Sequence, residues 1–280
     1  MRIIVVFSMF VLIASSAWGQ TLAFAPLPME NRETVLKQFM PMVNYLHDKL
    51  GIDVRFEYSD SYAEILQKFR QGKIDFAYLG PLPYVALKKE YPEAVPIAHF
   101  NEASGKPVYT CAIVAMADST VSLENLEDKK VALTQALSTC GFLSTNGLLR
   151  EHGSELAKNL YRYLDKHDAV ALSVVKGEYE LGGLKTAIGK KYAHLGLAVL
   201  AETKPMPSFA LIGNEKTLDP HIRDAIRNAL TALDATGRDK IMLEAWGENI
   251  RYGAVAGSDG DYDAVRQLLG NTEIPEKGNF

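Results

Sequence analysis

The chain has 280 residues, of which 48% are hydrophobic and 23% charged, and its formal net charge at pH 7 is −4. This is the composition of an ordinary globular protein with material for one large domain or two lobes. The net negative charge, without any basic cluster interleaved with aromatic residues, argues against nucleic acid as a partner.

The first residues predict an export signal. Arg2 supplies a short positive region, and residues 3–14 are almost entirely apolar. Small residues at Ala17 and Gly19 occupy the two positions that a signal peptidase reads. A membrane anchor is the alternative, but the apolar run is shorter than a bilayer-spanning helix requires. We therefore expect cleavage before Gln20 and an exported protein whose formal charge falls from −4 to −5 on loss of Arg2.

The segment up to residue 105 alternates strand-like and helix-like stretches, which is typical of an α/β protein. Pro41 interrupts the first apolar helical pattern and predicts a kink or break there. Ser61 and Glu64 have the spacing of a capping box, and Gly80-Pro81 opens a further helix. The expected elements are strands at 21–27, 52–58 and 73–79 and helices at 35–50, 62–69 and from 81 onward.

The same alternation continues from a second unit, beginning near Lys106, into a third stretch from Pro205. A helix over 166–178 should bury a face that carries Ala169, Leu172 and Val175. The expected strands are 108–117, 129–134, 179–184, 196–202 and 208–213. The expected helices are 123–126, 140–153, 166–178, one that starts after Asp219, one that ends near Ala245, and 261–269.

The chain contains no recognisable enzyme motif. The stretch "GGLKTAIGKK" resembles a phosphate-binding loop, but its glycine spacing is one residue too long and Lys191 stands where Ser or Thr is needed. The six histidines show no metal-ligand spacing, and no metalloprotease or serine-hydrolase motif occurs. We therefore expect no catalytic residues, no metal and no cofactor.

Strand ends that lead into helix N-termini recur along the chain. They occur at Gly80-Pro81, at Ser138-Thr139-Cys140 and near His167-Asp168. Such N-termini present free N–H donors and partial positive charge, so several of them meeting in one cleft would form an anion site. The alternative is that each capping residue satisfies only its own helix.

Four segments together resemble the PhnD-like periplasmic binding proteins, which serve phosphonate, phosphite and phosphate uptake. They are "SYAEILQKFRQGKIDFAYLGPLPYVAL", "VYTCAIVAMADS", "KKVALTQALSTCGF" and "KHDAVALSVVKGE". The resemblance covers nearly the whole mature chain. It implies a two-lobed α/β protein, a type II solute-binding protein that closes on its ligand in the periplasm. We expect lobe 1 at 20–105 and 205–280 and lobe 2 at 106–204.

The resemblance also implies a set of donors for a buried oxyanion. The alternative for the tyrosines is core packing, and for the histidine it is a solvent-facing helix cap. The residues carried over are Tyr62, Tyr78, Tyr109, Ser138, Thr139, the following Cys140, and His167.

The chain departs from the family pattern at two positions that bear on the charge of the ligand. Where some members carry an acid to meet a ligand ammonium, Pro207 is followed here by Ser208 and Phe209. An unpaired buried ammonium is costly, so we do not expect an amine-bearing ligand. Where another acid is often found, the chain carries Lys185, which either adds positive charge to the cleft or faces solvent.

Cys140 stands where the family usually has a serine, and Cys111 is the only other cysteine. Export favours a disulfide between them. Two alternatives remain open: Cys140 acts as a small donor in place of serine, or the thiols bind a thiophilic species such as arsenite, as in some sensor-linked relatives.

Three functions follow as hypotheses. The first is capture of phosphate, phosphite or a simple phosphonate for an ABC importer, with the permease as partner. The second is a periplasmic module that reports an oxyanion or arsenite to a sensor histidine kinase. The third is an exported enzyme with Cys140 as nucleophile and His167 as base, which the resemblance argues against.

Overall fold

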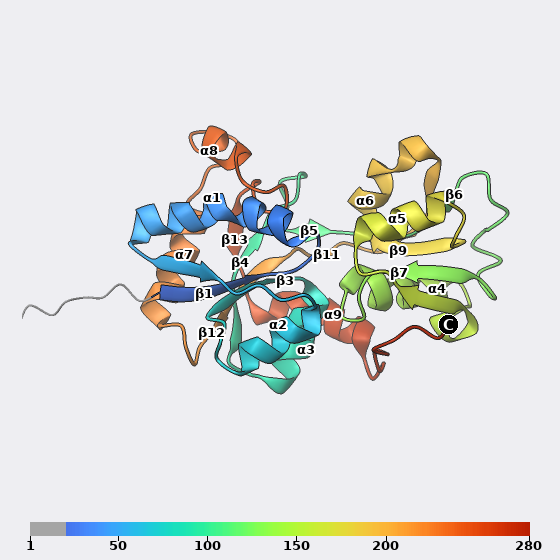
Figure 1. The fold of residues 1–280 in the computed structure, drawn as a ribbon, viewed down its shortest axis with the longest axis horizontal. Helices are drawn as coiled ribbons and strands as arrows, with labels where there is room; N and C mark the ends of the chain where they lie inside the picture. Colours follow the sequence, from blue (N-terminus) through green and yellow to red (C-terminus); the bar gives the residue numbers. More distant parts are fainter. Residues whose placement is uncertain (1–20) are drawn as a thin grey trace, which may run out of the picture.

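The computed structural model describes residues 21–280, so the predicted signal segment lies outside the described residues. Two sheets form the centres of two lobes that lie side by side (Figure 1). The chain is thus a two-lobed α/β protein, as expected. No helix in the described range is long and apolar enough to span a bilayer.

The first lobe is built on a six-stranded mixed sheet in the order β13-β4-β12-β3-β1-β2. Strand β1 pairs in parallel with β2 on one side and β3 on the other, and β12 runs antiparallel between β3 and β4. Its strands are β1 (Thr21–Pro26), β2 (Asp53–Phe56), β3 (Phe76–Leu79), β4 (Ala94–Phe100), β12 (Ala210–Asn214) and β13 (Ala254–Ala256). Its helices are α1 (Arg32–Leu50), α2 (Tyr62–Arg70), α3 (Pro81–Glu90), α7 (Pro220–Thr231), α8 (Lys240–Glu244), the 3₁₀ turn η4 (Asp259–Tyr262) and α9 (Asp263–Leu269).

The second lobe has a five-stranded sheet in the order β10-β6-β9-β7-β8. Its strands are β6 (Cys111–Met116), β7 (Lys130–Leu133), β8 (Leu160–Tyr163), β9 (Leu181–Lys185) and β10 (Leu197–Glu202). Its helices are the π-helical turn η1 (Thr139–Leu143), α4 (Ser144–Glu151), α5 (His167–Val175) and α6 (Thr186–Lys191), with 3₁₀ turns η2 (Leu156–Lys158) and η3 (Ala193–Leu195).

Two short strands join the lobes. β5 (Val108–Tyr109) and β11 (Met206–Pro207) pair antiparallel between the two sheets (Figure 1). Thr110 interrupts the strand that the sequence predicted over 108–117, so the chain leaves this ribbon before β6 begins. Two of the connections between the lobes therefore run through this ribbon.

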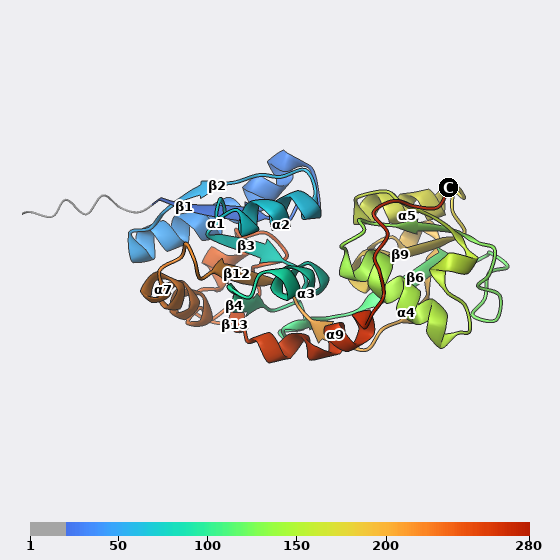
Figure 2. The ribbon, with the colours of Figure 1, turned by 90° about the horizontal axis from the view of Figure 1, so that it is seen from below.

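The C-terminal tail makes a third connection. After α9 the chain runs back across to the second lobe, as the view from below shows (Figure 2). Asn279 Oδ1 accepts the Tyr161 N–H at 2.7 Å, and the Tyr163 hydroxyl donates to the Pro275 carbonyl at 2.9 Å. The last residues of the segment expected in lobe 1 therefore contact β8, the edge strand of the second sheet.

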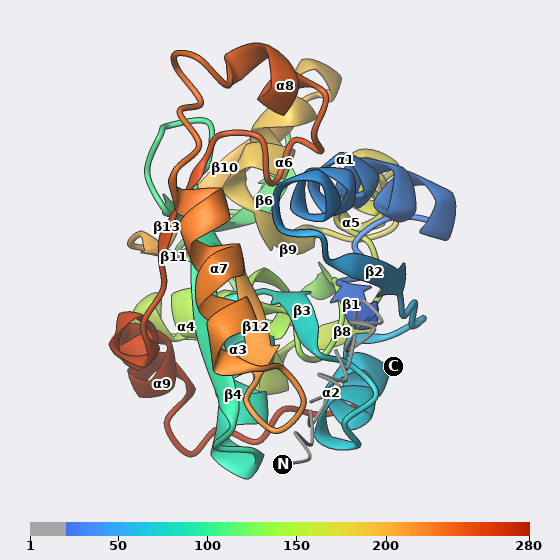
Figure 3. The ribbon, with the colours of Figure 1, turned by 90° about the vertical axis from the view of Figure 1, so that its left-hand side faces the viewer.

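Local sequence signals account for the helix starts that matter at the cleft. The Ser61 hydroxyl accepts the Glu64 N–H at 3.2 Å, which fixes the start of α2. Pro81 occupies the first position of α3, where a missing N–H costs nothing. Asp219 caps α7, which lies over β4 and β13 on the outer side of the first lobe (Figure 3).

Three predicted features differ in the structure. α1 continues through Pro41, because Phe39, Met42 and Val43 bury their side chains in the core and packing offsets the lost hydrogen bond. Residues 123–126 form a turn, so the short helix predicted there is wrong. α5 buries the face with Val170, Ala171 and Val174, and the predicted face with Ala169, Leu172 and Val175 is only partly buried.

Candidate functional site

A small cavity of about 10 Å³ lies between the lobes. Seven of the eight predicted site residues line it, together with four other residues. The predicted ones are Tyr62, Tyr109, Ser138, Thr139, Cys140, His167 and Lys185, and the others are Leu27, Gly80, Pro83 and Phe209. Its wall therefore combines hydroxyl, imidazole and ammonium groups with an apolar floor.

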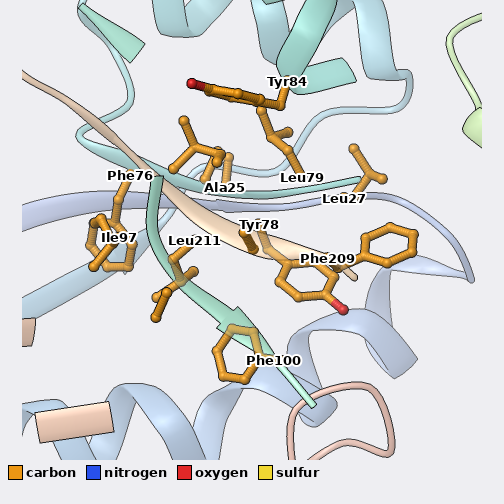
Figure 4. Close-up of a cluster of buried hydrophobic side chains, with 14 of the residues drawn as sticks. Ala25, Leu27, Phe76, Tyr78, Leu79, Tyr84, Ile97, Phe100, Phe209 and Leu211 are labelled. Atoms are coloured by element: carbon orange, nitrogen blue, oxygen red, sulfur yellow. The ribbon is translucent and has the colours of Figure 1, made fainter. Parts of the chain in front are cut away.

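Tyr78 is the predicted residue that does not line this cavity. Its ring stacks on Phe209, with ring centroids 5.3 Å apart, and packs edge-on against Phe39. Its hydroxyl donates to the Asn249 carbonyl at 3.4 Å. Figure 4 shows Tyr78 and Phe209 together within the buried cluster of the first lobe. Tyr78 thus supports the cavity wall from behind, through Phe209.

The N-terminus of α3 meets the second lobe directly. The Leu82 N–H donates to Thr139 Oγ1 at 3.0 Å, and both residues are buried. Pro81 has no N–H, so Leu82 carries the first donor that α3 offers. The turn that holds Thr139 therefore faces the helix end that the sequence predicted as an anion-binding element.

The N-terminus of α2 also contacts the second lobe. Its first residue, Tyr62, donates its N–H to Gln135 Oε1 at 3.1 Å across the lobes. Gln135 follows β7 and lies just before the Ser138–Thr139 turn. Its other side-chain atom, Nε2, is buried and has no hydrogen-bond partner among the described residues. The sequence missed Gln135 because nothing local distinguishes a glutamine that acts across a cleft.

The turn after β7 is held rigidly. Ser138 Oγ accepts the Gly141 N–H at 3.2 Å, so its hydroxyl caps η1. Gly141 is needed because a Cβ there would lie 3.1 Å from the Thr134 nitrogen and 3.2 Å from the Gln135 carbonyl oxygen. Tight backbone packing therefore orients Ser138 and Thr139.

The tyrosine hydroxyls at the cavity are kept protonated. Burial raises the pKa of both Tyr62 and Tyr109, and the negative charge of Asp165 adds to the increase at Tyr62. A hydrogen bond with Thr139 lowers the pKa of Tyr109 but does not cancel the effect of burial. At neutral pH both groups can therefore donate a hydrogen bond to an anion.

His167 is the first residue of α5 and is held as a neutral donor. Desolvation, followed by the Lys185 charge, lowers its pKa to about 4. Its Nδ1 accepts the Lys185 N–H at 3.3 Å, so in the neutral ring the proton sits on Nε2. The alternative of a solvent-facing cap does not fit the structure, because His167 lines the cavity.

Lys185 ends β9 and its side chain turns inward, with 12% of it exposed. The ammonium lies 2.7 Å from each carboxylate oxygen of Glu102, and 5.4 Å from the centre of the Tyr109 ring. The solvent-facing alternative is therefore wrong for Lys185. Glu102, in the loop before β5, is a residue that the sequence gave no reason to single out.

The two cysteines form a disulfide, with their Cα atoms 5.0 Å apart. The bond ties the Thr139–Cys140 turn to the start of β6, where the chain enters the second lobe. Neither sulfur remains as a thiol, which removes the free donor, the thiophilic site and the nucleophile considered at Cys140. No cluster of metal-ligating side chains occurs between residues 21 and 280.

The family model for the ABC transporter, phosphonate, periplasmic substrate-binding protein matches residues 24–262. The chain belongs to this family. The match spans both lobes and every residue of the cavity wall. Members of this family are substrate-binding proteins of transporters and not enzymes, as the sequence resemblance implied.

Curated relatives of this phosphonate-binding family cover most of the chain. It is 26% identical over 278 residues to the "Phosphate-import protein PhnD" of Mycolicibacterium smegmatis, covering 91% of this chain and 86% of that protein. It is 25% identical over 242 residues to the "Phosphonates-binding periplasmic protein" of Escherichia coli, covering 81% and 70%.

Solved structures share the fold. PhnD1 from Prochlorococcus marinus, solved in complex with methylphosphonate, superposes with a TM-score of 0.78 at 16% identity and covers 90% of this chain and 97% of its own. A binding protein component of an ABC phosphonate transporter from Pseudomonas aeruginosa gives 0.74 at 20% identity, with 89% and 85% covered. These similarities identify a type II periplasmic binding fold.

Proposed function

We propose that this chain captures a small phosphorus oxyanion, namely phosphate, phosphite or a simple phosphonate, and presents it to the permease of an ABC importer. The observation that carries the proposal is the cavity itself. Tyrosine and serine/threonine hydroxyls, a neutral imidazole and two helix N-termini converge on it from both lobes. Oxyanions are held by such arrays of donors, and none of these groups needs to react.

The ligand-binding residues in this proposal are the cavity-lining residues whose side chains can donate a hydrogen bond. Tyr62 enters from the first lobe and Tyr109 from the connecting ribbon, while the remaining donors enter from the second lobe. Cys140 and Tyr78 act indirectly, by tethering the turn and by supporting Phe209. The proposed donors are Tyr62, Tyr109, Ser138, Thr139, His167 and Lys185.

Binding requires the lobes to move. A volume of about 10 Å³ is close to that of one water-sized probe, so an oxyanion must enter while the lobes are further apart. The Leu82–Thr139 and Tyr62–Gln135 bonds both cross the gap. These bonds form again as the lobes close over the ligand, and the Thr139 hydroxyl that accepts from Leu82 still has its own O–H to donate to the ligand. The closed form is the one that the permease would recognise.

The thiol-dependent alternative is not carried forward. Reporting arsenite to a sensor kinase needs a free thiol, and both sulfurs are in the disulfide. Family membership supports a role beside a transporter. The predicted periplasmic location and the cleavage before Gln20 belong to the same proposal.

Isothermal titration calorimetry with methylphosphonate, phosphite and phosphate tests the proposal, with sulfate and arsenite as comparison ligands. We expect at least one phosphorus oxyanion to bind, with and without reductant. Failure of all three at every pH tested, or binding of arsenite alone after reduction, would contradict the proposed function.

A further inference from the structure

The cationic group of the cavity wall already has an anionic partner. Within the described chain, Lys185 is the one lining residue with an ammonium or guanidinium group. Its Nζ contacts both oxygens of Glu102 at 2.7 Å, and the side chains are only 12% and 23% exposed. A partly buried pair of this geometry is weakly screened by salt. The formal charge that Lys185 brings to the cavity is therefore cancelled.

The other titratable side chains that line the cavity within the described residues add no positive charge. His167 is neutral above its pKa of about 4, and the tyrosines remain protonated. The helix N-termini of α2 and α3 carry partial charge, but oxygens of Gln135 and Thr139 approach them in the closed arrangement.

The outer mouth of the cleft is lined by more acidic than basic side chains. A recess of about 450 Å³ beside Lys185 is lined by four carboxylates and two ammonium groups. Lys191 lies 3.4 Å from Asp168, and Glu248 lies 3.7 Å from Arg251. The charged groups that line this recess besides the Lys185–Glu102 pair are Glu30, Asp168, Lys191 and Glu248. The Lys166 ammonium lies beside it, 3.0 Å from the Glu30 carbonyl oxygen.

Resting on the proposed function, we propose that Glu102 is a specificity-determining residue. By neutralising Lys185 it makes the cavity select the singly charged form of its oxyanion over the doubly charged form. Hydroxyl groups, N–H groups and helix ends can offset one buried negative charge. A second charge loses its hydration without meeting an unpaired cation, and it lies near the Glu102 carboxylate.

The preference has a quantitative signature. If only the monoanion binds, affinity falls about tenfold per pH unit above the second pKa of the ligand. A ligand that is doubly charged in solution must also take up about one proton on binding. His167 does not contribute above about pH 6, because its pKa is about 4.

Calorimetry with methylphosphonate between about pH 6 and pH 9 measures both effects, with two buffers of different ionisation enthalpy to count protons. The variant Glu102→Gln keeps the shape of the side chain and frees the Lys185 charge. The matched control is Glu127→Gln, which removes the carboxylate of another 2.7 Å ion pair, with Lys158, far from the cavity. Melting temperatures of each variant report whether it folds.

We expect wild type and Glu127→Gln to lose affinity about tenfold per pH unit and to take up about one proton. Glu102→Gln should bind the dianion at least about tenfold more tightly than wild type one pH unit above the ligand pKa, with little proton uptake. Affinity that is flat or rises with pH in wild type, or a Glu102→Gln profile that matches wild type, overturns the inference while leaving the proposed function standing. Absence of binding by methylphosphonate, phosphite and phosphate overturns both.

Discussion

Replacing Thr139 with valine isolates one hydroxyl that acts across the cleft. Valine has nearly the same shape, so the change removes Oγ1 and leaves the packing of the turn intact. Oγ1 accepts the Leu82 N–H at 3.0 Å in a buried contact between residues 57 apart in sequence. Without it, Leu82 keeps a buried N–H with no acceptor from the second lobe when the lobes close.

The size of the effect follows from that unpaired donor. An unsatisfied buried N–H costs about 1–3 kcal/mol, which corresponds to roughly 5- to 150-fold in affinity. The cost is incurred only on closure, because water solvates the N–H when the lobes are apart. The variant should therefore bind methylphosphonate more weakly while its melting temperature without ligand changes little.

Calorimetry on wild type, Thr139→Val and Thr139→Ser makes the comparison. Serine keeps the hydroxyl, so it should retain most of the affinity. Equal affinity of Thr139→Val and wild type would refute the reasoning. An equal loss in both variants would show that loss of the hydroxyl alone does not explain the effect, because serine keeps that group.

Three further predictions concern the scaffold of the cavity. The Cys111–Cys140 disulfide closes a loop with a sequence separation of 29, so reducing it should destabilise the fold by about 3–4 kcal/mol. The melting temperature should fall when reductant is added, and an unchanged melting temperature would contradict this. The folded-state pKa of His167 is lowered from 6.5 to about 4, so its contribution to stability is complete above about pH 6.5 and is lost as pH falls toward 4. Urea unfolding should show a shallower acid loss in His167→Gln than in wild type, and identical slopes would exclude this role. Gly141→Ala places a methyl group against the Thr134 and Gln135 backbone, so it should cost about 1–3 kcal/mol of stability and weaken binding. A variant that unfolds in urea and binds ligand as the wild type does would contradict the packing argument.

Helix starts could be predicted because their signals are local. Ser61 and Asp219 accept N–H groups within three residues, and Pro81 acts through its own ring and missing N–H, so the sequence contains the whole signal. Which face of α5 is buried could not be predicted in the same way. The helix is apolar around most of its circumference, and the sheet against which it packs decides that Val170 and Val174 are buried.

The residues of the candidate site also divide into those with a local sequence signal and those without one. Tyr62, Thr139 and His167 could be named from the resemblance because they lie in recognisable segments. Glu102 and Gln135 could not, since each acts on a residue more than 70 positions away in the chain. Tyr78 lies in a recognisable segment, but the placement of Phe209 beside it directs its ring into the core.

A crystal structure grown with methylphosphonate tests the central claim most directly. The account predicts that the phosphonate oxygens lie between the lobes, within hydrogen-bond distance of Thr139, Ser138 and the Tyr109 hydroxyl. A phosphonate bound elsewhere on the molecule, with none of its oxygens within hydrogen-bond distance of these three residues, would contradict it.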